Sequence, residues 1–323
     1  MPPEPTLTWH DASGAAREIA IAPGQTVAAV LAAAGIRELR ATRRGLDGEG
    51  RGLFCGMGVC QDCLVEVDGA PNARACMTKA ATGMQLRHQD FPGAARVPIG
   101  AVPPPDDGPL PTPEVVDLLI LGGGAGGLSA AIAARRCGLE VLLLEERPAL
   151  GGQYYKQPAP GTGAPPLDAQ QSEGAALAVA AEASGARILR GAELWGAFDL
   201  DRLAVFDGRR TRLVAPRAMI VAAGAYERPH VVPGWTLPGV MTTGAAQTLW
   251  RSYRTLPGRR VLVAGNGPLN LQVACELAEA GAEVVAVAEA SPPPRLRWRE
   301  ALAMAAADLA LAAKGARYVA TLA

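Results

Sequence analysis

The sequence predicts an α/β protein in which a small mixed domain precedes two units of the doubly wound, Rossmann-like kind. Three observations support this fold class. Four of the 6 cysteines lie between residues 55 and 76, a proline-rich stretch follows, and two strand–glycine turn–helix–strand patterns come after it. A chain of 323 residues is long enough for two or three domains with cores of their own.

The amino-terminal part alternates short strands with one helix. Residues 5–10 and 16–22 are expected to be strands joined by a turn. Thr26 is placed to cap an alanine-rich helix over residues 27–34, which Gly35 ends. Residues 64–67 and 84–88 supply further strands, so the pattern indicates a mixed α/β unit.

The four clustered cysteines carry the most specific chemical signal. Their C-x4-C-x2-C spacing, with one later cysteine, is that of a plant-type [2Fe–2S] cluster, which needs four thiolates. A zinc ion held by the same thiolates and a redox Cys-x-x-Cys pair remain alternatives. A single Cys-x-x-Cys pair favours the cluster and therefore single-electron transfer. The expected ligands are Cys55, Cys60, Cys63 and Cys76.

The other two cysteines, Cys137 and Cys275, fall within the predicted helices and are expected to be buried. The segment 100–114 is rich in Pro, Gly and Asp, which indicates a linker. The predicted domains are therefore residues 1–99, a linker at 100–114, and two units at 115–257 and 258–323.

The first glycine-rich unit has a complete dinucleotide-binding pattern: a strand at 115–121, a glycine turn, a helix from 128 and a strand ending in an acid. The first glycine allows the tight turn, the second lets a pyrophosphate approach the backbone, and the third lets helix and strand pack closely. The helix amino terminus favours phosphate, and the acid can bind ribose hydroxyls. These residues are Gly122, Gly124, Gly127 and Glu145.

The second unit repeats the pattern with one change. Strands are expected at 260–264 and 283–288, around a helix that reaches residue 280 and before Glu289. Asn270 replaces the third glycine, so we expect a looser approach of helix and strand and an altered crevice. NAD(P) binding is not expected at this unit.

Composition excludes several classes of function. Apolar residues make up 49% and charged residues 19%, the formal net charge is +0, and no basic stripe occurs, so nucleic acid is not an expected partner. No segment reaches the ~20 apolar residues that a transmembrane helix needs. The amino terminus lacks a signal-peptide pattern, so we expect a cytoplasmic location, where thiols stay reduced.

Two further stretches resemble known proteins. Residues 118–153 resemble the FAD-binding start of flavoproteins with two dinucleotide-binding domains, and residues 220–247 resemble their second flavin-contacting segment. With residues 54–69 and 74–78, the chain resembles the FAD/[2Fe–2S] subunits of bacterial amino-acid and amine dehydrogenases. That family includes cyanide synthase, opine oxidase, hydroxyproline dehydrogenase and the α subunit of sarcosine oxidase.

The resemblance implies a β-grasp, ferredoxin-like amino-terminal domain and an electron-transfer role. A separate flavoprotein subunit would oxidise the C–N bond of a small amino acid or amine. This chain would pass the electrons to a quinone or another acceptor, which implies a peripheral association with the inner membrane through partners. The implied cofactors are a [2Fe–2S] cluster and FAD. The implied FAD contacts are Gly122, Gly124, Gly127, Glu145, Gly152, Gln153 and the turn at Ala223 and Gly224.

Members of this family usually continue beyond the point that corresponds to Ala323, so the resemblance implies a fragment or a carboxy-terminally shortened variant. An FAD domain that lacks its last strand would leave apolar sheet surface exposed. Two other functions stay open. One is a self-contained NAD(P)H-dependent FAD/iron–sulfur reductase, and the other is a non-catalytic assembly subunit whose flavin site has decayed. No acid–base or nucleophile constellation can be assembled, and the amine substrate and acceptor stay open.

Overall fold

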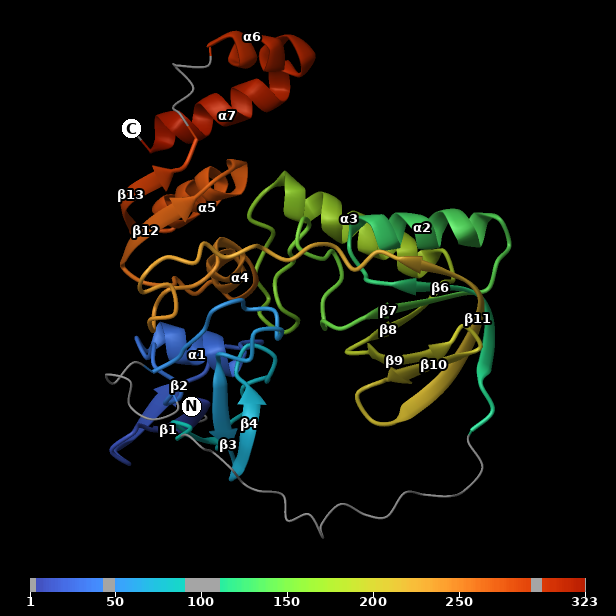
Figure 1. Ribbon diagram of the computed structural model, residues 1–323, viewed down its shortest axis with the longest axis horizontal. Helices are drawn as coiled ribbons and strands as arrows, with labels where there is room; N and C mark the ends of the chain where they lie inside the picture. Colours follow the sequence, from blue (N-terminus) through green and yellow to red (C-terminus); the bar gives the residue numbers. More distant parts are fainter. Residues whose placement is uncertain (1–3, 43–49, 91–110, 292–297, 323) are drawn as a thin grey trace. The chain divides into compact units, whose positions relative to one another are not determined.

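The computed structural model describes residues 4–42, 50–90, 111–291 and 298–322. The chain forms two compact units (Figure 1). Unit A comprises residues 1–95 and 227–323, and unit B comprises residues 96–226. Most of the predicted linker, residues 100–110, lies outside the described residues. The domain boundaries expected from the sequence stay predictions.

Unit A contains a sheet of five short strands with the order β2-β1-β5-β3-β4. β1 pairs with β5 in parallel, and the other neighbours are antiparallel. A parallel pair at the centre of hairpins, with one helix packed on the sheet, is the β-grasp arrangement that the resemblance implies. The elements are β1 (Thr6–His10), β2 (Ala16–Ala20), α1 (Val27–Ala33), β3 (Leu64–Val67), β4 (Ala70–Arg74) and β5 (Gln85–Arg87).

Helix α1 begins where the sequence predicts. The Thr26 hydroxyl accepts a hydrogen bond from the Ala29 N–H at 3.4 Å, which satisfies one of the free donors of the first turn. The helix then buries Val27, Val30 and Leu31 against the sheet, where they form one core with side chains such as Leu7. This core fixes the position of the loop that carries the cysteines.

The rest of unit A is a βαβ unit flanked by helices. β12 and β13 pair in parallel around α5, and α7 packs against α5. Leu249 of α4 is 2% exposed and belongs to the β-grasp core, while Ala246 of the same helix packs with Val273 and Leu277 of α5. Helix α4 therefore joins the two cores of unit A. The elements are α4 (Thr243–Tyr253), β12 (Arg260–Gly265), α5 (Pro268–Glu279), β13 (Glu283–Glu289), α6 (Trp298–Ala307) and α7 (Leu309–Thr321).

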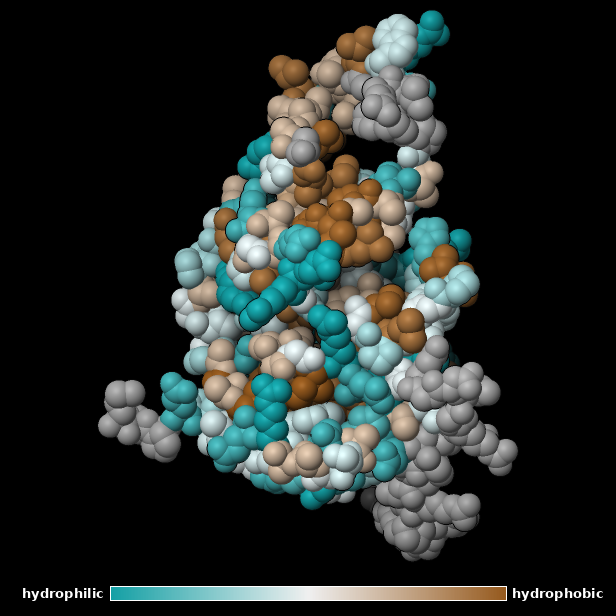
Figure 2. All heavy atoms as spheres, turned by 90° about the vertical axis from the view of Figure 1, so that its left-hand side faces the viewer, coloured by the Kyte–Doolittle hydropathy of each residue, from teal (hydrophilic) through white to brown (hydrophobic). Residues whose placement is uncertain are grey.

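The two-stranded sheet of unit A carries exposed apolar side chains. Leu262 on β12 is 66% exposed and Val285 on β13 is 51% exposed. Figure 2 shows hydrophobic residues gathered on this side of the molecule, level with β12 and β13 in Figure 1. Among the described residues, this small sheet therefore leaves apolar surface exposed on unit A.

Unit B is a six-stranded sheet with the order β8-β7-β6-β11-β10-β9. The first four are parallel, and β11, β10 and β9 form an antiparallel meander. Helices α2 and α3 lie side by side over one face of the sheet (Figure 1). The elements are β6 (Glu114–Leu121), α2 (Ala125–Arg136), β7 (Val141–Glu145), α3 (Ala169–Ala183), β8 (Arg187–Arg190), β9 (Glu193–Asp199), β10 (Arg202–Phe206) and β11 (Thr211–Val221).

The central strands of unit B are buried on both faces. Ile120 and Leu143 are 0% exposed and pack against Leu128 of α2, while Leu119 and Leu142 face the meander side. Burial on both faces is expected at the centre of a parallel sheet. Because β6, β7 and β11 run parallel to one another, their carboxyl ends meet at one edge of the sheet. Across the described residues, no helix has the length and apolar character needed to cross a lipid bilayer.

Candidate cofactor sites

The four clustered cysteines of unit A come together at the edge of the β-grasp sheet. We define residues 54–63 as the cluster loop. Cys63 directly precedes β3 and Cys76 follows β4, and the Ala75 N–H donates to the Cys63 carbonyl at 3.0 Å. Cys55, Cys63 and Cys76 are 6%, 1% and 5% exposed, and Cys60 is half-buried. Three of the four cysteines are therefore largely withdrawn from water.

The thiols form two pairs. A hydrogen bond from the Cys60 thiol lowers the pKa of Cys55 to about 5, and the same bond raises the pKa of Cys60. The bond between Cys63 and Cys76, together with burial, raises the pKa of Cys63. Backbone N–H groups also point at sulfur: Met57 N lies 3.3 Å from Cys55 Sγ. The lowered pKa of Cys55 favours its thiolate, which is the form that ligates metal.

The pairing of the four thiols bears on whether they hold a binuclear iron cluster or a single zinc ion. Among the residues that the structure describes, no three His, Cys, Asp or Glu side chains are arranged to ligate one metal ion. The thiols instead stand as Cys55 with Cys60 and Cys63 with Cys76. A binuclear cluster takes two thiolates on each iron, so this arrangement fits two irons better than a single tetrahedral zinc ion.

The glycines of the cluster loop meet the steric demand of a tight wrap. Gly56 and Gly58 have φ angles of +63° and +80°, a region that residues with a Cβ rarely adopt. A Cβ at Gly58 would lie 2.8 Å from Cγ of Met77, so the loop also has no room for a side chain there. The Arg74 guanidinium donates to the Gly58 carbonyl at 3.0 Å and holds the turn.

An ion-pair cluster supports the loop and was missed in the sequence. Arg40 donates through Nε to the Asp62 carbonyl at 3.2 Å and pairs through Nη2 with Asp62 Oδ1 at 3.1 Å. Arg51 Nε lies 3.8 Å from the same oxygen, and the Asp62 N–H lies 3.4 Å from Cys60 Sγ. The sequence feature that points to this cluster is Asp62, an acid between the predicted ligands Cys60 and Cys63, which would need a basic partner.

The remaining cysteines differ from each other. Cys275 is 2% exposed, as predicted, and its thiol donates to the Tyr318 carbonyl at 3.3 Å; burial raises its pKa. Cys137 is exposed, so the prediction of burial was wrong for it. It lies just beyond the last turn of α2, after Arg135 and Arg136, where the chain has left the packed face of the helix.

In unit B the first glycine-rich turn has the geometry that a dinucleotide site requires. Gly122 has a φ of +105°, and a Cβ there would overlap the Ala222 carbonyl. A Cβ at Gly127 would overlap the Gly122 carbonyl, so the absence of a side chain lets α2 approach β6. At Gly124 a Cβ would meet nothing nearer than Gly152 Cα at 3.7 Å, so the protein leaves room at that position.

Glu145 is 7% exposed and holds the turn. Its Oε2 accepts from Gly123 N at 2.8 Å, and its Oε1 accepts from Arg147 N at 2.8 Å. The sequence assigned this acid to ribose hydroxyls, whereas in the structure it first positions the glycine turn. Each oxygen has a second lone pair, so the two roles are compatible.

The other predicted FAD contacts lie at the same edge of the unit B sheet. Gly151 N donates to the Gly123 carbonyl at 2.8 Å, and a Cβ at Gly152 would come within 2.8 Å of Gly124 Cα. Ala222 N donates to the Leu121 carbonyl at 2.8 Å, so the turn that follows β11 lies beside the carboxyl end of β6. Gly152, Gln153, Ala223 and Gly224 are exposed.

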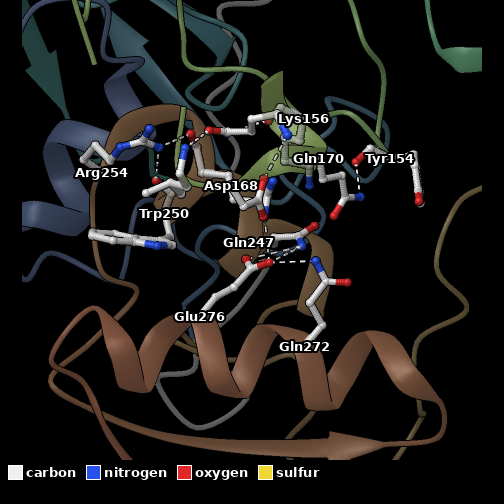
Figure 3. Close-up of polar contacts among 12 residues, drawn as sticks. Tyr154, Lys156, Asp168, Gln170, Gln247, Trp250, Arg254, Gln272 and Glu276 are labelled. Atoms are coloured by element: carbon white, nitrogen blue, oxygen red, sulfur yellow. Dashed lines mark hydrogen bonds and ion pairs between the residues drawn. The ribbon is translucent and has the colours of Figure 1, made fainter. Parts of the chain in front are cut away.

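This edge is the topological switch point of the sheet, where β6 has β7 on one side and β11 on the other. Helix α2 starts there at Gly124 without a side-chain cap among the described residues, as suits a helix that offers its N–H groups to a phosphate. The next segment is anchored on α3: Gln170 donates to the Tyr154 carbonyl at 2.6 Å (Figure 3), and the buried Gln171 donates to the Lys156 carbonyl at 2.7 Å.

The second glycine-rich turn, in unit A, has a different packing. Asn270 is 7% exposed and its Nδ2 lies 2.7 Å from where a Cβ of Gly265 would be. Its Oδ1 accepts from the Thr243 hydroxyl at 2.8 Å. The asparagine side chain therefore fills the place where a glycine would leave room. Glu289 accepts from Gly267 N at 3.1 Å, one position further along the turn than the glycine that Glu145 holds in the first unit.

Two known families match this chain, one over the residues that carry the clustered cysteines and one over the residues that carry the two glycine-rich turns. Residues 16–90 match the family described as 2Fe-2S iron-sulfur cluster binding domain. Residues 116–316 match the family described as pyridine nucleotide-disulphide oxidoreductase. These matches confirm the predicted fold class and the two predicted cofactors, a [2Fe–2S] cluster and FAD.

Similar proteins include oxidase subunits. A subunit of the opine oxidase of Agrobacterium tumefaciens is 35% identical over 194 residues, which are 56% of this chain and 38% of that protein. The HcnB subunit of the hydrogen cyanide synthase of Pseudomonas protegens is 34% identical over 177 residues, or 53% of this chain and 38% of that protein. The alpha subunit of the sarcosine oxidase of Rhizobium meliloti is 29% identical over 198 residues, 57% of this chain and 20% of that protein.

The chain thus spans well under half the length of the relatives it matches. Among solved structures, L-proline dehydrogenase from P. horikoshii aligns with 88% of this chain and 54% of that chain, with a TM-score of 0.67 and 22% identity. That likeness supports the fold alone. The relatives also confirm the resemblance to FAD/[2Fe–2S] dehydrogenase subunits that the sequence motifs indicate.

Proposed function

The chain belongs to the pyridine nucleotide-disulphide oxidoreductase family as an FAD-dependent oxidoreductase with a [2Fe–2S] domain, and from this premise we propose that it is the electron-transfer subunit of a hetero-oligomeric dehydrogenase for small amino acids or amines. The observation that carries the proposal is the combination of two thiol pairs in unit A, with three of the four thiols buried, and a complete dinucleotide turn in unit B. Redox chemistry is what the cluster and FAD supply when bound.

The residues have the following proposed roles. Cys55 and Cys60 hold one iron, and Cys63 and Cys76 hold the other. The first turn of α2 receives the FAD pyrophosphate, where Gly124 leaves room and the helix N–H groups lack a side-chain cap. Glu145 keeps the turn in place and binds ribose hydroxyls with its remaining lone pairs. Gly122, Gly127, Gly152, Gln153, Ala223 and Gly224 complete the proposed FAD contacts.

The substrate, partner and acceptor belong to the proposal as well. The similar proteins are named as subunits of opine oxidase, hydrogen cyanide synthase and sarcosine oxidase, which supports partner subunits for this chain. To one such partner, a separate flavoprotein, we assign the oxidation of the substrate C–N bond. The proposed acceptor is a quinone or another electron acceptor, reached by peripheral association with the inner membrane through partners. A cytoplasmic location suits four thiols that must stay reduced until they bind metal.

The test uses the chain isolated anaerobically together with the subunits that co-purify with it. Small amino acids and secondary amines are added one at a time, and the flavin absorbance and the iron–sulfur EPR signal are recorded. We expect one class of amine to bleach the flavin and produce the EPR signal in the complex, and the chain alone to show neither change. Bleaching of the flavin of the isolated chain by an amine would contradict the proposal that a separate subunit oxidises the amine.

A second candidate function has one observation in its favour. The second turn retains the strand–turn–helix order, and the acid after its second strand, Glu289, also accepts from a glycine N–H of the turn. A self-contained NAD(P)H-dependent reductase would use such a turn. Anaerobic NADH or NADPH separates the two functions: rapid flavin bleaching would favour the reductase, and we expect none. A chain that takes up no FAD on reconstitution would instead be an assembly subunit.

A further inference from the structure

Helix α4 lies directly against the cluster loop. The Thr242 N–H donates to the Phe54 carbonyl at 3.0 Å. Two residues along the loop, a Cβ on Gly56 would lie 3.1 Å from Cα of Ala245. The start of α4 therefore contacts the residues immediately before and after Cys55. These contacts join segments almost two hundred residues apart in the sequence.

A carboxylate is fixed at the same turn. Glu227 Oε2 accepts from the Gly244 N–H at 2.6 Å, and Gly244 precedes the alanine that touches Gly56. One Cα–Cα step is about 3.8 Å, so the charge is held within a few such steps of the loop backbone. Glu227 is half-buried, so water screens its charge less than that of an exposed acid. It has no part in the proposed ligand set or in the FAD contacts.

Guanidinium groups contact the rest of the loop. Arg74 donates to the Gly58 carbonyl, and Arg40 with Arg51 surrounds Asp62. The cluster loop is thus held by guanidinium groups at its centre and end, where Asp62 offsets part of their charge, and by the start of α4 that Glu227 holds. Hydrogen bonds, net charge and exposure around a cluster set its reduction potential.

We propose that Glu227 lowers the reduction potential of the cluster bound by this loop, through its charge at the first turn of α4. This inference rests on the proposed function, because it needs the cluster that the four cysteines are proposed to hold. Reduction adds one electron and makes the centre more negative. A nearby fixed carboxylate opposes the added charge and so disfavours the reduced state.

The test is the substitution Glu227→Gln in the whole chain. Glutamine keeps an oxygen that can accept from Gly244 N and removes only the charge. The midpoint potential is measured by an anaerobic titration followed by EPR, with iron and sulfide content measured in parallel. We expect a shift to higher potential with unchanged iron and sulfide. Glu227→Asp, which retains the charge, should restore a potential near that of the wild type.

Glu289→Gln is the matched control. Glu289 makes the same kind of bond, from a carboxylate to a glycine N–H at the start of a helix, but at Gly267 of α5. We expect it to leave the potential unchanged. Equal shifts in both variants, no shift in Glu227→Gln, or loss of iron in that variant alone would each overturn the inference. A wild-type chain that binds no iron would overturn the proposed function as well, so the two failures can be told apart.

Discussion

At the scale of single residues, the glycine turn of unit B separates two kinds of glycine. Gly126 and Gly127 are neighbours in the first turn of α2, but their surroundings differ. A Cβ on Gly127 would overlap the Gly122 carbonyl, whereas a Cβ on Gly126 would meet nothing within 4 Å. Only Gly127 is therefore required by the packing of the helix on its strand.

This contrast gives a prediction with a built-in control. Gly127→Ala should destabilise unit B by about 1–3 kcal/mol, because the added methyl group forces α2 away from β6. It should also weaken FAD binding, since the turn moves with the helix. Gly126→Ala should be neutral or stabilise the protein by up to about 1 kcal/mol, because alanine favours a helix. Urea unfolding and FAD titration measure both effects.

The two variants must differ for this account to hold. Equal losses of stability would mean that any side chain in the turn is harmful, and the close contact between Gly127 and Gly122 would not be the cause. Normal FAD binding by Gly127→Ala would show that the turn is not the pyrophosphate site.

At the scale of elements, α4 and α5 are joined by a buried polar cluster. Arg251 is 1% exposed, and its Nη1 lies 2.8 Å from Glu276 Oε1. Gln247 and Gln272 donate to the same carboxylate at 3.4 Å and 2.7 Å (Figure 3). A buried pair of this kind is costly to break, because one charge is left without its partner.

Glu276→Ala should therefore destabilise unit A by about 3–5 kcal/mol. The double variant Arg251→Met/Glu276→Leu should recover most of that loss, because both charges are replaced by apolar side chains of similar size. Free energies of unfolding for Arg251→Met, Glu276→Leu and the double variant complete the cycle. Additive losses in the double variant would show that the two side chains act independently.

The secondary-structure elements also show what a sequence can predict. The Thr26 cap, the start of α1 and the two βαβ units follow from local rules of capping and periodicity, and the structure has them within a few residues. β4 went unnoticed because Pro71 and Asn72 interrupt the strand pattern, and Asn72 has a φ of +65°. The segment is a strand in the structure because β4 pairs with strand β3, a contact that its local sequence does not indicate.

At the scale of the whole molecule, some site residues follow from local sequence patterns and others are identified only by the fold. Spacing alone predicts the four thiols and the glycine turn, because each is a local feature of the chain. The pairing of thiols, the support of Asp62 by Arg40 and Arg51, and the contact of α4 with Gly56 depend on segments brought together only by folding. Asn270 illustrates the limit: the sequence shows the missing glycine, but not that the amide bonds to Thr243.

The central claim is that the thiols of unit A hold two irons in a chain that also binds FAD. The most direct measurement is the iron, acid-labile sulfide and flavin content of protein isolated without oxygen. We predict about two irons and two sulfides per chain together with FAD, loss of iron and sulfide in Cys76→Ser, and retention of both in Cys137→Ser, whose thiol is exposed and remote in sequence. Zinc in place of iron, or iron without sulfide, would contradict the account.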